Sequence, residues 1–143
     1  MKKVLFVCVH NSARSQMAEA FTNIYGNNVI SAESAGLEKG QLNPYVVIAM
    51  QEVGIDISHN QTKTTQMMLD LGKHYDYVVT VCDGASKEKC PLFPGVKARF
   101  HWDLEDPSSF KGTKDEILRR VRVIRDEIKN RVNDFIKEQI TEN

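Results

Sequence analysis

Short apolar runs that alternate with stretches of helical periodicity constrain the fold of this chain most strongly. Residues 3–9 are nearly all apolar, which is typical of a parallel strand buried on both faces, and residues 13–25 then carry apolar side chains at helical spacing. Asn43-Pro44 supplies an N-cap and a first turn for a later helix. The other predicted strands are 28–32, 76–82 and 97–102, and the other predicted helices are 44–53, 64–71 and 114–139. The alternation favours right-handed βαβ units, a parallel sheet and one α/β domain over residues 1–143.

The connections between these elements are rich in turn residues. Ser34-Ala35-Gly36 predicts a loop after the second strand. Residues 83–95 contain glycine and proline breaks and predict a loop that can include a short helix, and residues 103–113 predict a turn-rich loop.

The last predicted helix, 114–139, is amphipathic. Its apolar positions recur every three or four residues: Ile117, Val121, Ile124, Ile128, Val132, Phe135 and Ile136. The opposite face carries Arg, Lys, Asp and Glu. We expect this helix to pack on the sheet with a solvated outer face, and the alternative is a helix that binds a partner.

Charge and composition exclude several classes of protein. The 143 residues include 19 basic and 19 acidic side chains, so no basic surface for nucleic acid is indicated. No apolar stretch approaches the roughly 20 residues that span a bilayer, and the first residues lack the pattern of a signal peptide. We therefore expect a cytoplasmic protein with neither a nucleic acid nor a membrane as partner. Three cysteines in a reducing compartment are catalytic, redox-active or simply buried, because they do not form a disulfide framework there.

The segment from Cys8 to Ser15 predicts an oxyanion-binding loop. It begins at the end of a buried strand, and Arg14 and Ser15 follow at the start of a helix. Such a loop can point successive backbone N–H groups into its centre, the helix N-terminus adds positive potential, and an arginine can bind two oxygens of a tetrahedral anion. The expected oxyanion-binding residues are Val9, His10, Asn11, Ser12, Ala13, Arg14 and Ser15.

Cys8 is the expected nucleophile of this loop. The positive potential that binds an anion also favours thiolate over thiol, and the Ser15 hydroxyl can donate a hydrogen bond to the sulfur. Asn11 tolerates a left-handed backbone and can brace the loop. His10 either tunes the charge of the loop or has no role. The alternative for the whole segment is a buried cysteine that happens to lie beside a surface arginine.

Asp106 is the candidate proton donor. A nucleophile that displaces oxygen from an oxyanion needs an acid for the leaving group. Asp106 lies in a polar loop and is followed by Pro107, which fixes the backbone beside the acid. Taken alone, Asp-Pro is a turn signal, and the oxyanion loop is what gives it a second interpretation.

Cys82 and Cys90 form a third feature. Cys82 ends the predicted strand 76–82, at the edge where parallel sheets place their sites. Their spacing does not match a zinc motif, and no histidine pair completes a ligand set, so we expect no metal. They are either two unrelated buried cysteines or thiols that exchange a disulfide across a glycine-containing segment.

Together these motifs resemble the thioredoxin-coupled arsenate reductases, which share the fold of the low-molecular-weight protein tyrosine phosphatases. The resemblance covers nearly the whole chain. The motifs that carry it are Cys8 to Arg14 with Ser15-Gln16-Met17-Ala18-Glu19, Ser34-Ala35-Gly36, Asn43-Pro44, Val79-Thr80-Val81-Cys82 with Cys90-Pro91, and His101-Trp102 with Asp106-Pro107.

The resemblance implies a single domain with a four-stranded parallel sheet and helices on both faces. It also implies a reaction in which the Cys8 thiolate attacks arsenate held by the loop and Arg14, while Asp106 protonates the departing oxygen. Cys82 would then attack Cys8 and release arsenite, and Cys90 would attack Cys82. Thioredoxin would reduce the Cys82–Cys90 disulfide, so no bound cofactor is expected, and phosphate or sulfate would mimic arsenate.

Some positions depart from the family pattern. Many relatives have glycine in place of His10 and cysteine in place of Ala13, and the latter is not one of the relay thiols. Some relatives bind potassium beside the loop through an aspartate that aligns with Lys63. The other potassium ligands would be Asn11, Glu19 and Ser34. We expect the lysine ammonium group to replace the cation.

Two other functions are compatible with the same loop. A tyrosine phosphatase would use Cys8, Arg14 and Asp106 with water as the second nucleophile. Phosphatases of this fold usually carry a tyrosine pair after Asp-Pro, where this chain has Ser108-Ser109. An oxyanion-binding or arsenic-sensing module would retain the loop without turnover.

Overall fold

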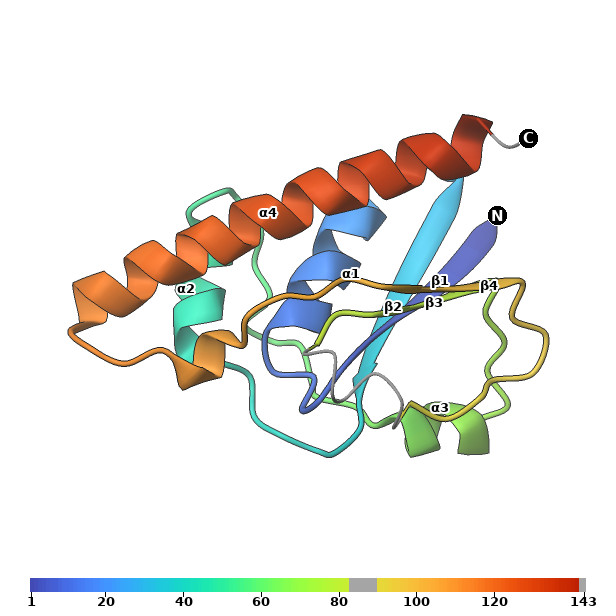
Figure 1. The fold of residues 1–143 in the computed structure, drawn as a ribbon, viewed down its shortest axis with the longest axis horizontal. Coiled ribbons are helices and arrows are strands. Elements are labelled where there is room, and N and C mark those ends of the chain that lie inside the picture. Colours follow the sequence, from blue (N-terminus) through green and yellow to red (C-terminus); the bar gives the residue numbers. More distant parts are fainter. Residues whose placement is uncertain (83–89, 142–143) are drawn as a thin grey trace.

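Four parallel strands form the centre of the computed structural model, which describes residues 1–82 and 90–141 (Figure 1). The strand order in the sheet is β2-β1-β3-β4, with every neighbouring pair parallel. In chain order the elements are β1 (Lys2–Cys8), α1 (Arg14–Tyr25), β2 (Ile30–Gly36), α2 (Pro44–Gln51), α3 (Thr65–Asp70), β3 (Tyr77–Thr80), β4 (Ala98–His101), a short 3₁₀ helix (Pro107–Ser109) and α4 (Lys114–Thr141). The predicted parallel α/β fold is confirmed.

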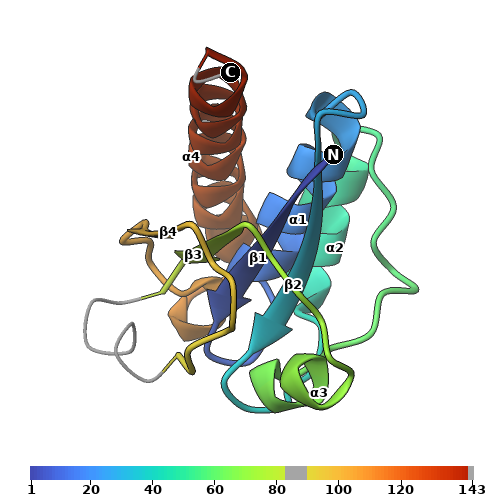
Figure 2. The ribbon, with the colours of Figure 1, turned by 90° about the vertical axis from the view of Figure 1, so that its right-hand side faces the viewer.

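The sheet has a hydrophobic core on each face, because successive side chains of a strand point to opposite sides. The first core contains Val4 and Phe6 of β1 and is covered by α1, α2 and α4. The second core contains Leu5 and Val7 and is covered by α3 and the loops beside it. Figure 2 shows α1 and α2 beside the sheet, with α4 on the same side. Helices therefore cover both faces, as expected.

The long helix α4 packs on the first core. Its predicted apolar stripe is buried at Val121, Ile124, Ile128, Val132, Phe135 and Ile136, and Leu118 adds to it. Because each such side chain contributes about 1.5–3 kcal/mol when fully buried, this face binds the helix to the sheet. The interpretation of α4 as a packed helix is confirmed.

The second strand lies later in the sequence than predicted. Residues 28–32 are not all strand, because Asn28 has a left-handed φ of 63° and the strand begins at Ile30. Ser34-Ala35-Gly36, predicted as a loop, completes β2 and pairs with the last three residues of β1. Small residues resemble a turn in sequence, but here they are buried in the sheet. A Cβ on Gly36 would lie 2.6 Å from the Asn11 nitrogen, so the strand end needs glycine to pass the loop.

Other element boundaries are close to those predicted. The strand predicted over 76–82 is observed as Tyr77–Thr80, and the loop predicted over 103–113 contains the 3₁₀ helix. Of the loop predicted over 83–95, residues 83–89 lie outside the described part of the structure. Within residues 1–82 and 90–141, no helix combines the length and apolar character needed to cross a bilayer.

Candidate active site

The predicted oxyanion loop connects the carboxyl end of β1 to the start of α1. Cys8 is the last residue of β1 and Arg14 is the first residue of α1, and both are buried. Between them, Asn11 and Ala13 are buried, Val9 and Ser12 are half-buried, and His10 is exposed. The sequence predicts this strand–loop–helix arrangement because Cys8 ends an apolar run and helical spacing begins just after the loop.

The Cys8 sulfur lies in a set of hydrogen bonds. The Asn11 backbone N–H donates to Cys8 Sγ over 3.2 Å, and Ser15 Oγ lies 2.8 Å from the same sulfur. The Asn11 side-chain amide donates to Ser15 Oγ over 2.8 Å. Because Ser15 Oγ already accepts this bond, its own hydrogen is available to the sulfur. The sulfur is thus placed to accept two hydrogen bonds, one from a backbone N–H and one from a hydroxyl group.

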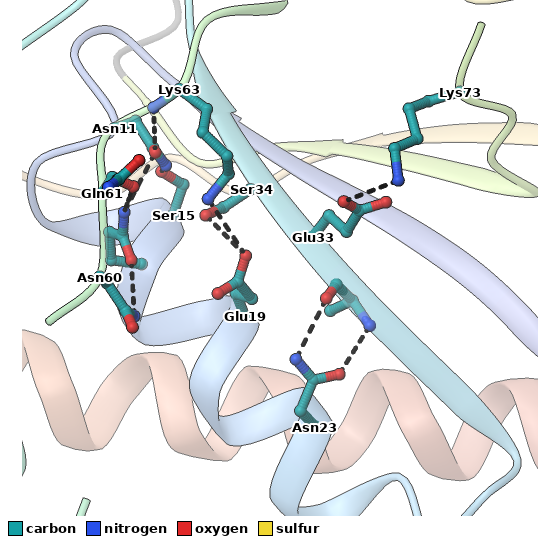
Figure 3. Close-up of polar contacts among 12 residues, drawn as sticks. Asn11, Ser15, Glu19, Asn23, Glu33, Ser34, Asn60, Gln61, Lys63 and Lys73 are labelled. Carbon is teal, nitrogen blue, oxygen red and sulfur yellow. Dashed lines mark hydrogen bonds and ion pairs between the residues drawn. The ribbon is translucent and has the colours of Figure 1, made fainter. Parts of the chain in front are cut away.

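Asn11 is the centre of a buried network that braces the loop (Figure 3). Its Oδ1 accepts from the backbone N–H of Lys63 over 2.9 Å and from Gln16 Nε2 over 3.1 Å. Since a backbone N–H can only donate, these contacts fix which way the amide points. The Asn11 φ of 56° confirms the predicted left-handed backbone.

Gln16 extends this network to Asn60 and Gln61, in a loop that was not predicted to contact the site. Its side-chain nitrogen also donates to the Gln61 carbonyl, and its side-chain oxygen accepts from Asn60. Both contacts join residues more than forty positions apart in the chain. Local sequence signals do not reveal such partners.

Arg14 and Asp106 lie close together although they are far apart in sequence. The buried guanidinium of Arg14 donates to the Leu104 carbonyl over 3.0 Å, and its NH2 lies 3.7 Å from Asp106 Oδ2. The candidate acid is thus beside the oxyanion loop, and its side chain is 32% exposed, so solvent reaches the carboxylate.

Asp106 also forms the turn that the Asp-Pro sequence signals. Its Oδ1 accepts from the Ser108 backbone N–H over 3.0 Å, and its carbonyl accepts from the Ser109 hydroxyl over 2.7 Å. The carboxylate therefore caps the 3₁₀ helix Pro107–Ser109. The two interpretations of Asp106 are compatible, because one oxygen serves the turn while the other faces Arg14.

His10 lies at the surface of the loop. Its Nε2 is 3.3 Å from a carboxylate oxygen of Glu38, and both side chains are well exposed. The two can form an ion pair when the imidazole is protonated. The pairing supplies a local partner for His10 and assigns it no contact with Cys8.

Lys63 lies beside the oxyanion loop, where its ammonium group was expected to replace a potassium ion (Figure 3). Its Nζ lies 3.9 Å from a carboxylate oxygen of Glu19, and Ser34 Oγ donates to the same oxygen over 3.0 Å. Burial raises the pKa of Glu19, while the Lys63 charge and the Ser34 hydrogen bond act in the opposite direction. The positive charge that balances Glu19 is therefore part of the chain itself.

Cys8, Cys82 and Cys90 are all buried, reduced thiols. The Val81 backbone N–H donates to the Val7 carbonyl over 2.8 Å, so Cys82 leaves β3 next to the end of β1, where Cys8 lies. Cys90 belongs to the second core, on the opposite face of the sheet from Cys8.

The surroundings of Cys90 have opposing electrostatic effects. Burial raises the pKa of its thiol, and the charge and hydrogen bond of Arg99 lower it less strongly. Among the residues that the structure describes, no three His, Cys, Asp or Glu side chains are arranged to hold a metal ion.

The fold and the loop define a class of protein. The family model described as "Low molecular weight phosphotyrosine protein phosphatase" matches residues 3–143. The chain belongs to this family.

Similar proteins give a narrower comparison. The chain is 45% identical over 134 residues to an arsenate reductase of Shouchella clausii, covering 94% of each protein. A solved arsenate reductase in the phosphate-binding state is 35% identical, with a TM-score of 0.76 and coverage of 96% of this chain and 98% of that one. A thioredoxin-dependent arsenate reductase of Corynebacterium glutamicum is 29% identical, with a TM-score of 0.72 and coverage of all of this chain and 64% of that one.

Proposed function

We propose that this protein reduces arsenate to arsenite with electrons from thioredoxin. The observation that carries the proposal is the Cys8 sulfur, held by Ser15 and the Asn11 backbone in an oxyanion loop, with another reduced thiol, Cys82, directly after the adjacent strand. A phosphatase needs only the first of these thiols. Similar proteins named arsenate reductase support the same function. The activity belongs to one domain, residues 1–143, in the cytoplasm, where thiols remain reduced.

The first step is nucleophilic attack on arsenic. The backbone N–H groups of residues 9–15 and the Arg14 guanidinium hold the arsenate oxygens, as they would hold phosphate or sulfate. The Cys8 thiolate forms a sulfur–arsenic bond, and one arsenic–oxygen bond breaks. Asp106 gives its proton to the departing oxygen, which leaves as water.

The second step reduces arsenic. The Cys82 thiolate attacks the Cys8 sulfur, a Cys8–Cys82 disulfide forms, and the electron pair of the sulfur–arsenic bond remains on arsenic. Arsenic is thereby reduced from the pentavalent to the trivalent state and leaves as arsenite. The two sulfurs together supply both electrons, so no bound organic cofactor takes part.

The third step moves the disulfide away from the oxyanion loop. The Cys90 thiolate attacks Cys82, which releases the Cys8 thiolate for another cycle and forms a Cys82–Cys90 disulfide. The position of Cys90 in the second core supports this order, because Cys82 lies beside the end of β1 while Cys90 lies on the other face. Thioredoxin then reduces the Cys82–Cys90 disulfide by dithiol exchange.

A second candidate activity is phosphatase chemistry. The pairing of Arg14 with Asp106 beside Cys8 is what a cysteinyl-phosphate mechanism also requires. We expect this as a weak side activity, since Ser108 and Ser109 are engaged in the turn and supply no aromatic surface for a phosphotyrosine ring.

The test is arsenate-dependent oxidation of NADPH in the presence of thioredoxin and thioredoxin reductase. The parent protein should turn over many times. Cys8→Ser should abolish both arsenate reduction and phosphatase activity, because a hydroxyl is a poor nucleophile at neutral pH. Cys90→Ser should stop after one turnover with a Cys8–Cys82 disulfide that mass spectrometry locates, while phosphatase activity survives. Full multiple turnover by Cys90→Ser would show that the relay is wrong.

A further inference from the structure

Asn43 joins three parts of the molecule that meet at the candidate site. Its backbone N–H donates to the carbonyl of Ser12, in the oxyanion loop, over 2.9 Å. Its side-chain Oδ1 accepts from the backbone N–H groups of Tyr45 and Val46 and so caps α2. Its Nδ2 donates to Ser108 Oγ, in the turn that carries Asp106, over 3.1 Å. Only 9% of Asn43 is exposed.

The orientation of this amide follows from the chemistry of its partners. Backbone N–H groups need an acceptor, so Oδ1 must face Tyr45 and Val46 at the start of α2. Nδ2 is therefore directed at Ser108, and the hydroxyl there acts as the acceptor. One short side chain thus serves as both a helix cap and a bridge.

The bridge reaches the candidate acid through a single residue. Ser108 accepts from Asn43 with its hydroxyl and donates its backbone N–H to Asp106 Oδ1 over 3.0 Å. A continuous path of hydrogen bonds and one short turn therefore connects Ser12 of the oxyanion loop to the carboxylate of Asp106.

The turn that carries Asp106 is anchored on one side by Phe110, which is buried in the first core. On the side of α2 the surface is hollowed by an open pocket of about 270 Å³, and Asn43, Pro44, Pro107, Ser108 and Phe110 contribute to its walls. The Asn43–Ser108 hydrogen bond joins two of the residues that line this pocket.

We propose that Asn43 is a positioning residue that sets the Asp106 carboxyl group at the correct height above the oxyanion loop. This inference rests on the proposed function, in which Asp106 is the general acid. Asn43 touches no reacting atom. It acts by preventing the acid turn from moving relative to the loop that holds the oxyanion, and a displacement near 1 Å is enough to reduce proton transfer strongly.

The test uses the phosphatase side activity with aryl phosphates of different leaving groups. A general acid matters most when the leaving oxygen is strongly basic, as in phenyl phosphate, and little when it is weakly basic, as in 2,4-dinitrophenyl phosphate. A misplaced acid therefore reduces kcat/KM for the first substrate only. A merely structural defect reduces it for both.

Two variants remove the bridge in different ways. Asn43→Ser retains a good helix cap but is too short to reach Ser108, and Ser108→Ala removes the acceptor while the cap on α2 remains. Each should reduce kcat/KM for phenyl phosphate about 10-fold, and for 2,4-dinitrophenyl phosphate less than about 2-fold. Ser108→Thr, which retains the hydroxyl, should restore the parent pattern. The double variant Asn43→Ser/Ser108→Ala should lose no more kcat/KM for phenyl phosphate than either single variant, because both changes remove the same hydrogen bond.

Asp106→Asn gives the largest expected loss of kcat/KM for phenyl phosphate, since it removes the acid itself. Equal losses on both substrates, or no loss in Ser108→Ala, would overturn the positioning role. If the parent protein hydrolysed no aryl phosphate at all, Asp106 would not act as a general acid here, and the positioning role of Asn43 would be overturned as well. Failure of the proposed function gives a different result, namely the selective aryl phosphate pattern without thioredoxin-dependent arsenate turnover.

Discussion

Replacement of Asn11 separates the backbone and side-chain contributions of the residue that braces the oxyanion loop. Asn11→Gly retains the left-handed conformation but removes the side-chain hydrogen bonds. Lys63 then loses the acceptor for its backbone N–H, while Gln16 retains the Gln61 carbonyl. A buried donor without a partner costs about 1–3 kcal/mol. Glycine also raises the conformational entropy of the unfolded chain, which lowers the free energy of unfolding by about 0.4–1 kcal/mol. We expect a loss of about 1.5–4 kcal/mol in the free energy of unfolding.

Asn11→Ala tests the backbone contribution. Alanine at a φ of 56° adds strain of about 1–2 kcal/mol, while it loosens the unfolded chain less than glycine does. The alanine variant should therefore be less stable than the glycine variant by about 0.5–1 kcal/mol. Both should also alkylate more slowly at Cys8, because the bonds that orient Ser15 are lost. Urea denaturation monitored by tryptophan fluorescence measures the free energies, and iodoacetamide labelling measures the reactivity.

Asn28 supplies the matched control. It has a similar φ of 63°, but it is exposed, and within the part of the chain that the structure describes its side chain makes no hydrogen bond. Asn28→Gly should be nearly neutral, and Asn28→Ala should repeat the backbone difference alone. If Asn11→Gly destabilises no more than Asn28→Gly, the network around Asn11 does not brace the loop and the reasoning fails.

Three further results are expected. Alkylation of Cys90 should speed up with pH through its raised pKa, and Arg99→Gln should move this profile to higher pH; an unchanged profile would contradict the influence of Arg99. Potassium should not raise thermal stability or kcat/KM above the values in sodium at equal ionic strength, because Lys63 supplies the local positive charge; clear activation by potassium would disprove this. The Lys3 backbone N–H and the Lys97 charge lower the pKa of Asp76, so its ionised form stabilises the fold above the pKa of the unfolded chain, near 3.9. Asp76→Asn should thus be less stable at neutral pH, and the difference should shrink as pH falls through the folded pKa; a difference independent of pH in urea denaturation would refute it.

The sequence was sufficient for features that depend on local pattern. Cys8 ends a buried run and Arg14 opens a helix, so the strand–loop–helix unit could be predicted without any tertiary contact. The left-handed Asn11 and the buried stripe of α4 followed in the same way. The end of β2 could not be predicted in this way, because Ser34-Ala35-Gly36 resembles a turn until its pairing with β1 is known.

Contacts between distant segments were beyond the sequence. Gln16 binds Gln61, and Asn43 binds Ser108, across separations that no local periodicity encodes. A proton-donor role for Asp106 was predicted for chemical reasons, and the structure adds that its carboxylate lies 3.7 Å from Arg14. A polar side chain on a buried helix face can find a partner almost anywhere in the chain, so its presence alone does not name that partner.

The placement of Cys8 and Cys90 in cores on opposite faces of the sheet has an evolutionary consequence. In the proposed relay, substitutions that change substrate binding fall around Cys8, and substitutions that change exchange with the electron donor fall around Cys90. The two cores consist of different side chains on opposite faces of the sheet. Under that relay a lineage changes its donor without altering its oxyanion loop, whereas Cys82, which lies where β3 meets the end of β1, serves both sides.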